Sequence, residues 1–137
     1  MSPGSAPSPS KEAAIKHLAR ARQFHQAYLR LKNGRQDLDW AIIVLFYTAL
    51  HLIQAYFVET ASNAFQIPRT HDDRRTRVGI SLTPLFQHYR TLEDYSKDAR
   101  YDPDYTPPTS EELQELEGLD FAPIATELRS RGISLHA

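Results

Sequence analysis

The sequence predicts an all-α protein, an up-and-down bundle of four long helices plus a short helix. Three observations support this fold class. The segment DWAIIVLFYTALHLIQAYFV, residues 39–58, carries no charged residue after Asp39 and is far too long for one β-strand. Helix-start signals recur along the chain. No segment shows the strict alternation or the hairpin turns that are typical of a β-sheet.

The first ten residues, MSPGSAPSPS, are rich in Ser and Pro and are predicted to be a disordered tail, residues 1–10. Ser10 is a favourable N-cap, so the first helix is expected to begin at Lys11. Asn33-Gly34 tolerates the left-handed conformation and is expected to end it. The bundle is predicted over residues 11–132, with a C-terminal tail at 133–137.

The second helix is expected to begin at Asp37 or Asp39 and to run to about Thr60. It is apolar almost all round, which is typical of a helix surrounded by others, although its length also approaches that of a membrane span. Its Tyr, His and Gln side chains are costly in lipid, and the N-terminus lacks the apolar core of a signal peptide. We therefore expect the core helix of a cytoplasmic protein with no membrane partner.

A short helix is expected over residues 71–78, where Thr70 and an acid three residues later resemble a capping box and Gly79 closes the helix. Thr83-Pro84 then starts a fourth helix, because proline is harmless at the first helical position. This helix is expected to end near Arg100, before the segment DPDYTPP.

A fifth helix is expected to open at Thr109, where Glu112 completes a second capping box. An interruption is expected at Gly118, with the helix resuming after Asp120 and ending before Gly132. Together with the first, second and fourth helices, this completes the four long elements of the bundle.

Composition excludes some chemistry. The chain of 137 residues has no cysteine, so disulfides, thiolate catalysis and cysteine-based metal sites are excluded. The net charge of −1 is unevenly distributed: residues 11–35 hold seven Lys or Arg and one Glu, whereas residues 93–120 hold ten acids and two bases. The basic segment either forms a nucleic-acid face or neutralises the acidic one across the fold.

Polar side chains at helical spacing occur in three stretches: in the second helix, in the short helix and at the end of the fourth. Residues three or four positions apart share a helix face, so each stretch presents a polar face. If these faces point inward, their imidazoles and guanidiniums meet at one mouth of the bundle. We predict His51, His71 and Arg100 as catalytic residues, and Tyr47, Arg74, Arg75 and Tyr101 as phosphate-binding residues.

Such a set of side chains can hold a phosphate through paired, charge-assisted bonds from Arg. It could also cleave RNA without a metal, with His removing the 2′-hydroxyl proton and Arg stabilising charge on the phosphorane. No metal site and no cofactor are predicted, since the histidines lack the close carboxylate partners that a zinc site expects.

A purely structural role is open for each of these residues. His51 would then be a satisfied core histidine, and Arg100 would cap the carbonyls at the end of its helix. The arginines that flank His71 would form a solvated charge cluster. Tyr47 and Tyr56 would serve as core or interface aromatics.

Three motifs resemble the HEPN superfamily, the higher eukaryotes and prokaryotes nucleotide-binding domain. They are DWA…FYTALH…AYF at residues 39–57, RTHDDRR at 69–75 and YRTLEDYSKDARY at 89–101. The resemblance implies a bundle of four or five helices that commonly forms homodimers. Many such proteins are metal-independent ribonucleases in toxin–antitoxin, CRISPR-linked or phage-defence systems. Others are noncatalytic and bind RNA or nucleotides, or pair with a nucleotidyltransferase.

Active HEPN proteins carry an Arg followed after four to six residues by a His. Arg100 matches the Arg of that motif, but no His follows it here. Two other pairs have this Arg-to-His spacing, namely Arg20 with His25 and Arg131 with His136.

The resulting hypothesis is a HEPN-like homodimer that binds RNA or a nucleotide in a prokaryotic defence or toxin–antitoxin system, with metal-independent ribonuclease activity as an extension. The alternative is a noncatalytic dimerising module whose basic first or acidic fifth helix docks a partner protein. A dimer is expected because four aromatic residues exceed what one central helix face needs. These residues are Trp40, Tyr47, Tyr56 and Phe57.

Overall fold

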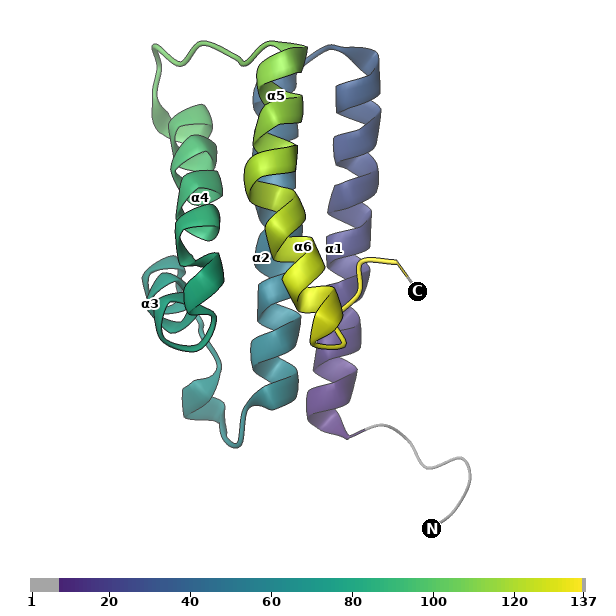
Figure 1. The fold of residues 1–137 in the computed structure, drawn as a ribbon, viewed down its shortest axis with the longest axis vertical. Coiled ribbons are helices and arrows are strands. Elements are labelled where there is room, and N and C mark those ends of the chain that lie inside the picture. Colours follow the sequence, from purple (N-terminus) through teal and green to yellow (C-terminus); the bar gives the residue numbers. More distant parts are fainter. Residues whose placement is uncertain (1–7, 137) are drawn as a thin grey trace.

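The computed structural model describes residues 8–136 and confirms the all-α, up-and-down bundle (Figure 1). No strand occurs within this range. The long elements are α1 (Pro9–Gly34), α2 (Leu38–Thr60), α4 (Phe86–Tyr101) and a last rod made of α5 (Ser110–Leu116), the π-helical turn η3 (Glu117–Phe121) and α6 (Ala122–Ser130). The short elements are α3 (His71–Ser81) and the 3-10 turns η1 (Ala64–Gln66) and η2 (Thr83–Leu85).

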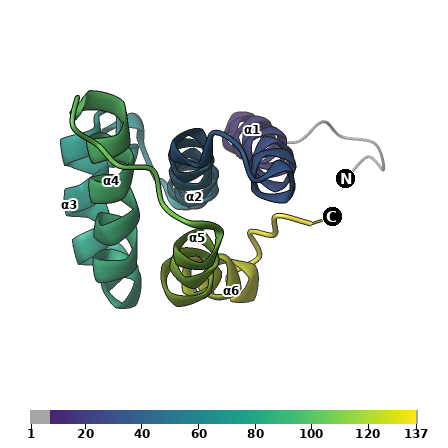
Figure 2. The ribbon, with the colours of Figure 1, turned by 90° about the horizontal axis from the view of Figure 1, so that it is seen from above.

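Helix α2 lies at the centre of the bundle. Seen from above, α1 lies on one side of it, α3 and α4 on the other, and the α5–α6 rod covers a third side (Figure 2). Its side chains dominate the core, and Leu45, Phe46 and Leu52 are completely buried. The helix is therefore apolar all round because other helices contact it on nearly every side.

The length and composition of α2 would also allow it to cross a membrane. However, 78% of its most apolar window is buried inside the bundle. A lipid-facing span would expose those side chains, so this burial is what the core helix of a soluble protein shows.

The first helix begins earlier than predicted. Ser8, not Ser10, is the N-cap, and its hydroxyl accepts a hydrogen bond from the Lys11 backbone N–H. Residues 1–7 of the expected tail lie outside the described residues, whereas Pro9 already belongs to the helix. At the other end, Arg35 takes the left-handed conformation (φ 53°) expected of Asn33-Gly34.

The short helix α3 is longer than predicted, because it continues through Gly79 to Ser81. Its start agrees with the prediction, since the Thr70 hydroxyl accepts a bond from the Asp73 backbone N–H. A Cβ atom on Gly79 would lie 3.3 Å from the Phe86 ring. The glycine thus serves the close packing of α3 against the start of α4, not the end of the helix.

The last rod contains the predicted capping box, in which Thr109 and Glu112 each bond the other's backbone. The expected interruption at Gly118 is the π-turn η3, where the Ala122 N–H bonds the Glu117 carbonyl five residues earlier. Pro123 explains this wider turn, because a proline in a regular α-helix lacks an N–H and collides with the preceding turn.

Residues 133–136 are not a separate tail. Ile133 and Leu135 are buried in the core. Arg22 of α1 donates from Nε to the Leu135 carbonyl at 2.8 Å and from Nη2 to the Ser134 carbonyl at 3.2 Å. The folded unit thus extends beyond the predicted boundary at residue 132.

Replacing Leu52 by Ala should lower the free energy of unfolding by about 2–5 kcal/mol, because it opens a cavity in the centre of the core. The matched control Leu119→Ala, at a side chain that is 60% exposed, should change it by less than about 0.5 kcal/mol. Urea unfolding followed by circular dichroism measures both. Equal effects of the two substitutions would contradict the central position of α2.

Candidate functional site

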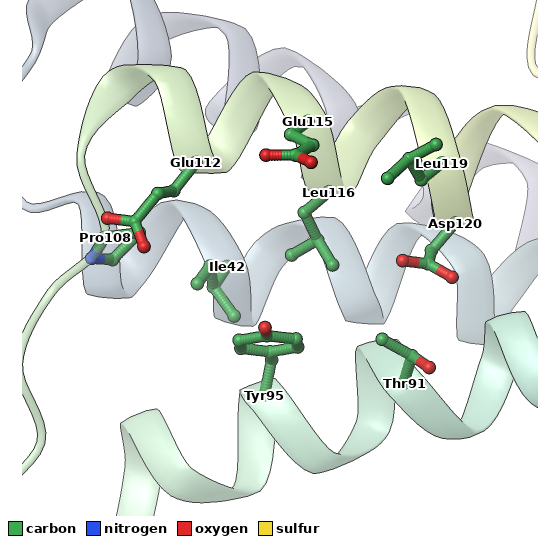
Figure 3. A pocket seen from close by; sticks show the side chains of 9 residues that line it. All are labelled: Ile42, Thr91, Tyr95, Pro108, Glu112, Glu115, Leu116, Leu119 and Asp120. Carbon is green, nitrogen blue, oxygen red and sulfur yellow. The ribbon is translucent and has the colours of Figure 1, made fainter.

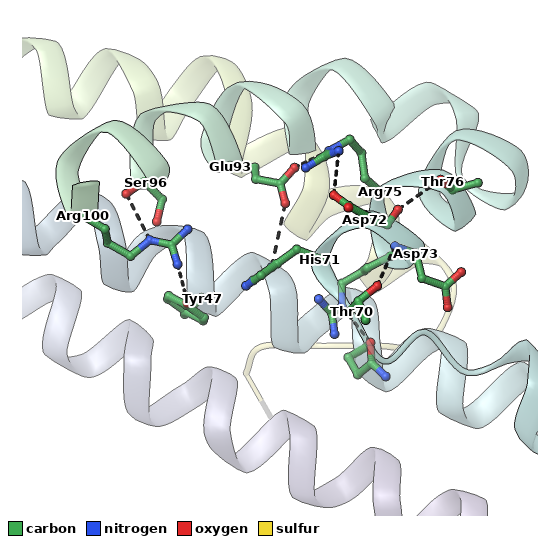
Figure 4. Close-up of polar contacts among 12 residues, drawn as sticks. Tyr47, Thr70, His71, Asp72, Asp73, Arg75, Thr76, Glu93, Ser96 and Arg100 are labelled. Carbon is green, nitrogen blue, oxygen red and sulfur yellow. Dashed lines mark hydrogen bonds and ion pairs between the residues drawn. The ribbon is translucent and has the colours of Figure 1, made fainter. Parts of the chain in front are cut away.

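All the predicted site residues except Tyr101 lie along a band of polar side chains on α2, α3 and α4, which we call the polar seam. Figure 4 shows Arg100, Tyr47, His71 and Glu93 along this band. The seam comprises Tyr47, His51, Gln54, His71, Arg74, Arg75, Glu93, Ser96 and Arg100.

Arg100 and His71 both contact Tyr47. The Arg100 Nη1 donates to the Tyr47 hydroxyl at 2.9 Å, and its Nε donates to the Ser96 carbonyl one turn earlier at 3.2 Å. The His71 ring stands edge-on to the Tyr47 ring, with centroids 6.3 Å apart. We call Tyr47, His71 and Arg100 the Arg100 cluster.

Arg100 also lies over the ring of Tyr101, at 5.1 Å from its centroid. Tyr101 is 70% exposed, whereas Tyr47 and Arg100 are half-buried. The Arg100 cluster therefore reaches the surface beside an open aromatic ring.

His71 is the first residue of α3, and its Nδ1 lies 3.8 Å from Oε2 of the buried Glu93. That nitrogen is buried and makes no hydrogen bond to the described residues, and the same holds for Ser96 Oγ. Burial lowers the pKa of His71, as do Arg74 and Arg100, while Glu93 opposes them. The imidazole is therefore neutral at pH 7.

Arg75 is already neutralised by carboxylates. Its Nε donates to Glu93 at 2.6 Å and its Nη1 to Asp72 at 3.3 Å (Figure 4). These bonds raise the pKa of Arg75 and keep its guanidinium away from an incoming phosphate. Its contacts are those of a residue that holds Glu93 in position. They fit the predicted phosphate-binding role less well.

Arg74 is only 8% exposed, so it also fits the predicted phosphate-binding role poorly. Its Nε donates to the Gln54 side chain at 2.9 Å, and Gln54 in turn donates to the Pro68 carbonyl at 2.8 Å. These bonds fasten the loop before α3 to the central helix.

His51 does not contact the Arg100 cluster. It faces α1, where its Nδ1 lies 3.0 Å from Nδ1 of His17 and its ring stacks on Phe24. Phe24 also stacks on Tyr47, so this ring of α1 lies against both His51 and the Arg100 cluster. His71 and Arg100 thus both lie against Tyr47, whereas His51 pairs with His17 of α1, so the three catalytic candidates do not share one set of contacts.

Burial, together with the neighbouring His17, Arg20 and Arg74, lowers the pKa of His51 to about 4. Burial and Arg74 also lower the pKa of His17. Two neutral imidazoles can share one hydrogen bond between the facing nitrogens, with one ring as donor and the other as acceptor.

Sequence reasoning missed His17 and Glu93. Helical spacing could have identified Glu93, which lies on the same face of α4 as Ser96 and Arg100. No local pattern could have identified His17, because its partner is 34 residues away.

The two Arg–His pairs with HEPN-like spacing do not form pairs in space. Arg20 lies over Phe24, whereas His25 stacks on Phe121 of η3. Arg131 donates to the Tyr56 hydroxyl at 3.0 Å and to Glu127 at 3.1 Å, whereas the His136 ring lies edge-on to His25. Neither pair therefore builds an Arg–His site within one chain.

The aromatics that predicted a dimer are mostly used within the chain. Phe57 is 5% exposed, Tyr56 binds Arg131, and Tyr47 belongs to the seam. Trp40, at 57% exposed, is the member of that set that stays on the surface. Fewer aromatic side chains are therefore available for a dimer interface than the sequence suggested.

The chain matches no protein-family model, no curated protein and no solved structure. Within residues 8–136, no three His, Asp or Glu side chains come together in a way that could hold a metal ion.

His51 should make stability depend on pH. Between its ordinary pKa of 6.5 and its lowered pKa of about 4, the unfolded chain binds a proton that the folded chain does not. Stability is therefore full above pH 6.5 and falls as the pH drops through this window. The variant His51→Gln should lose less stability over it, by on the order of 1 kcal/mol after allowance for solvent screening of the partly exposed ring.

Urea unfolding of both proteins at a series of pH values measures this difference, and NMR titration of the His51 ring protons checks its cause. A ring that titrates near 6.5 would contradict the burial assigned to His51.

Proposed function

We propose that the protein is a HEPN-like, cytoplasmic protein that binds RNA or a nucleotide and holds a phosphate group at the Arg100 cluster. The observation that carries this proposal is the meeting of Arg100, Tyr47 and His71 from three helices at the edge of the seam. By the same resemblance, we propose a role in a prokaryotic defence or toxin–antitoxin system.

Charge favours Arg100 as the phosphate ligand. Among residues 8–136 its guanidinium donates to a hydroxyl and a carbonyl, both neutral, and it has no carboxylate partner. Its positive charge is therefore uncompensated, in contrast to that of Arg75. An arginine in this state gains a strong, charge-assisted bond when a phosphate arrives.

The surroundings of Arg100 suit a nucleotide better than a free phosphate. The exposed ring of Tyr101 lies under the guanidinium and offers a face on which a base can stack. Such stacking is worth about 1–3 kcal/mol per base and does not depend on sequence. We therefore expect single-stranded RNA to be preferred over a duplex.

The variant Arg100→Gln should bind a single-stranded RNA oligonucleotide about tenfold more weakly, because one phosphate contact is lost. The slope of log affinity against log salt should fall by about 0.7 between roughly 50 and 200 mM salt. Fluorescence anisotropy measures both quantities. The control Arg90→Gln removes an exposed arginine of the same helix that pairs with Asp94, and it should keep nearly wild-type affinity.

Absence of RNA binding by the wild type at low salt would end this proposal. Equal losses of RNA affinity in Arg100→Gln and Arg90→Gln would show a general effect of positive charge and would contradict a specific phosphate site at Arg100.

The neutral state of His71 supports a further step, cleavage of the bound RNA without a metal. The imidazole would take the proton of a 2′-hydroxyl, whose oxygen would attack phosphorus while the bond to the 5′-oxygen breaks. The 5′-oxygen would then take a proton from water, leaving a 2′,3′-cyclic phosphate. Arg100 would stabilise the negative charge that develops on the phosphorane oxygens.

Cleavage should therefore persist in excess EDTA and should fall by about 100-fold or more in His71→Gln. The control His88→Gln alters a histidine that binds Asp120, and it should cleave like the wild type. Gel analysis of a labelled RNA gives the rates and identifies the cyclic product. Equal cleavage by all three proteins would assign the activity to another source.

One observation favours the alternative, a noncatalytic dimerising module that docks a partner protein. A hollow of about 240 Å³ lies between α4 and α5, with Glu112, Glu115 and Asp120 along its edge (Figure 3). Tyr95 and Leu119 add exposed apolar surface there. A basic, partly apolar segment fits this groove, whether it comes from a second copy, a nucleotidyltransferase or another defence-system protein. RNA binding distinguishes this alternative from the leading proposal.

A further inference from the structure

A second cleft lies on the other side of the α5–α6 rod from the α4–α5 groove, between α1, the π-turn with α6, and the C-terminal segment. Its volume is about 390 Å³, within the roughly 300–1,000 Å³ of small-molecule sites. None of the seam residues lines it. It is therefore a separate candidate site.

One side of this cleft is apolar and flat. The rings of His25 and Phe121 are nearly parallel, with centroids 6.0 Å and planes 11° apart. Ala122 and Ala125 follow on α6, and Leu135 closes the side. Larger side chains at the two alanine positions would fill the hollow, so their size keeps this surface open to a planar group.

The other side of the cleft carries the positive charge of Arg129. Arg129 lines it from the last turn of α6, and it makes no side-chain hydrogen bond or ion pair within residues 8–136. His136 also lines the cleft, and its ring lies edge-on to that of His25, with centroids 5.8 Å apart. An arginine and two imidazoles thus border one hollow.

The carboxylate in this cleft, Glu117, is already occupied. Its Oε1 accepts from the Tyr28 hydroxyl at 2.6 Å and from Lys32 Nζ at 2.8 Å. Burial opposes ionisation, but these two bonds lower the pKa of Glu117. Its negative charge is matched by Lys32, which leaves the charge of Arg129 available to a ligand.

The π-turn and a clamp on the C-terminal segment build the cleft. Phe121 is the last residue of η3, and turns of this kind occur frequently at functional sites. Arg22 of α1 holds the carbonyls of Ser134 and Leu135, and thereby fixes the wall that carries His136.

We propose that this cleft binds a small ligand that combines a planar ring with one anionic group, the ring against Phe121 and the alanines and the anion on Arg129. The ring would replace water on the apolar surface, and the anion would meet a guanidinium that has no internal partner. Neither part alone would use both sides of the cleft.

The test uses the full-length protein and 2-naphthoate, with 2-naphthamide as the neutral analogue and acetate as the anion without a ring. NMR spectra follow the ring protons of His25 and His136, and calorimetry gives the affinity. We expect saturable, one-to-one binding of 2-naphthoate. Binding of 2-naphthamide and acetate should be about tenfold weaker or undetectable.

The variant Arg129→Gln should weaken 2-naphthoate binding about tenfold or more, because the charged partner of the anion is lost. Arg22→Gln should also weaken 2-naphthoate binding, because it releases the C-terminal segment that carries His136. Arg100→Gln, in the seam, should leave it unchanged, which separates this site from the proposed RNA site. Absence of saturable shifts at His25 and His136, or an affinity that Arg129→Gln does not alter, would overturn the proposal.

Discussion

Helix α2 carries Tyr47, His51 and Gln54 through the middle of the bundle, and these polar groups need partners there. A buried donor or acceptor without one costs about 1–3 kcal/mol. Each of the three finds its partner on a different helix or loop: Tyr47 on α4, His51 on α1 and Gln54 on α3 and its preceding loop. The contacts of the polar seam thus allow α2 to be enclosed by the other helices. The candidate site is made from the same contacts.

This double role explains why the arginines of the seam differ in what they can do. Arg74 and Arg75 are bound by Gln54 and Glu93, and they fix α3 against α2 and α4. Arg100 is bound to neutral oxygens at the open end of the seam. Arg75 would have to break an ion pair to bind an anion, and Arg74 is only 8% exposed, whereas the half-buried Arg100 can recruit an anion without breaking an ion pair. Structural support and ligand binding therefore fall to different arginines.

The sequence predicted the bounds of most helices better than the partners of their side chains. Thr70 and Thr109 cap their helices through neighbours three residues away, so local spacing is enough to recognise them. Gly79 was predicted to end α3, but it lies inside the helix because the Phe86 ring approaches its backbone. The contacts of His71 and Arg100 with Tyr47, and of His51 with His17, depend on how α1, α3 and α4 pack around α2. Spacing within one helix does not contain that information.

Helix α1 borders both candidate sites through adjacent residues. Phe24 faces the seam and stacks on Tyr47 and His51, whereas His25 faces the cleft and stacks on Phe121. Consecutive residues on a helix point about 100° apart, so one helix supplies two walls without sharing a side chain between them. Effects at sites that share no partner usually add. Coupling between a phosphate at Arg100 and an anion at Arg129 would therefore require α1 itself to move, and its packing against the central helix opposes such a shift.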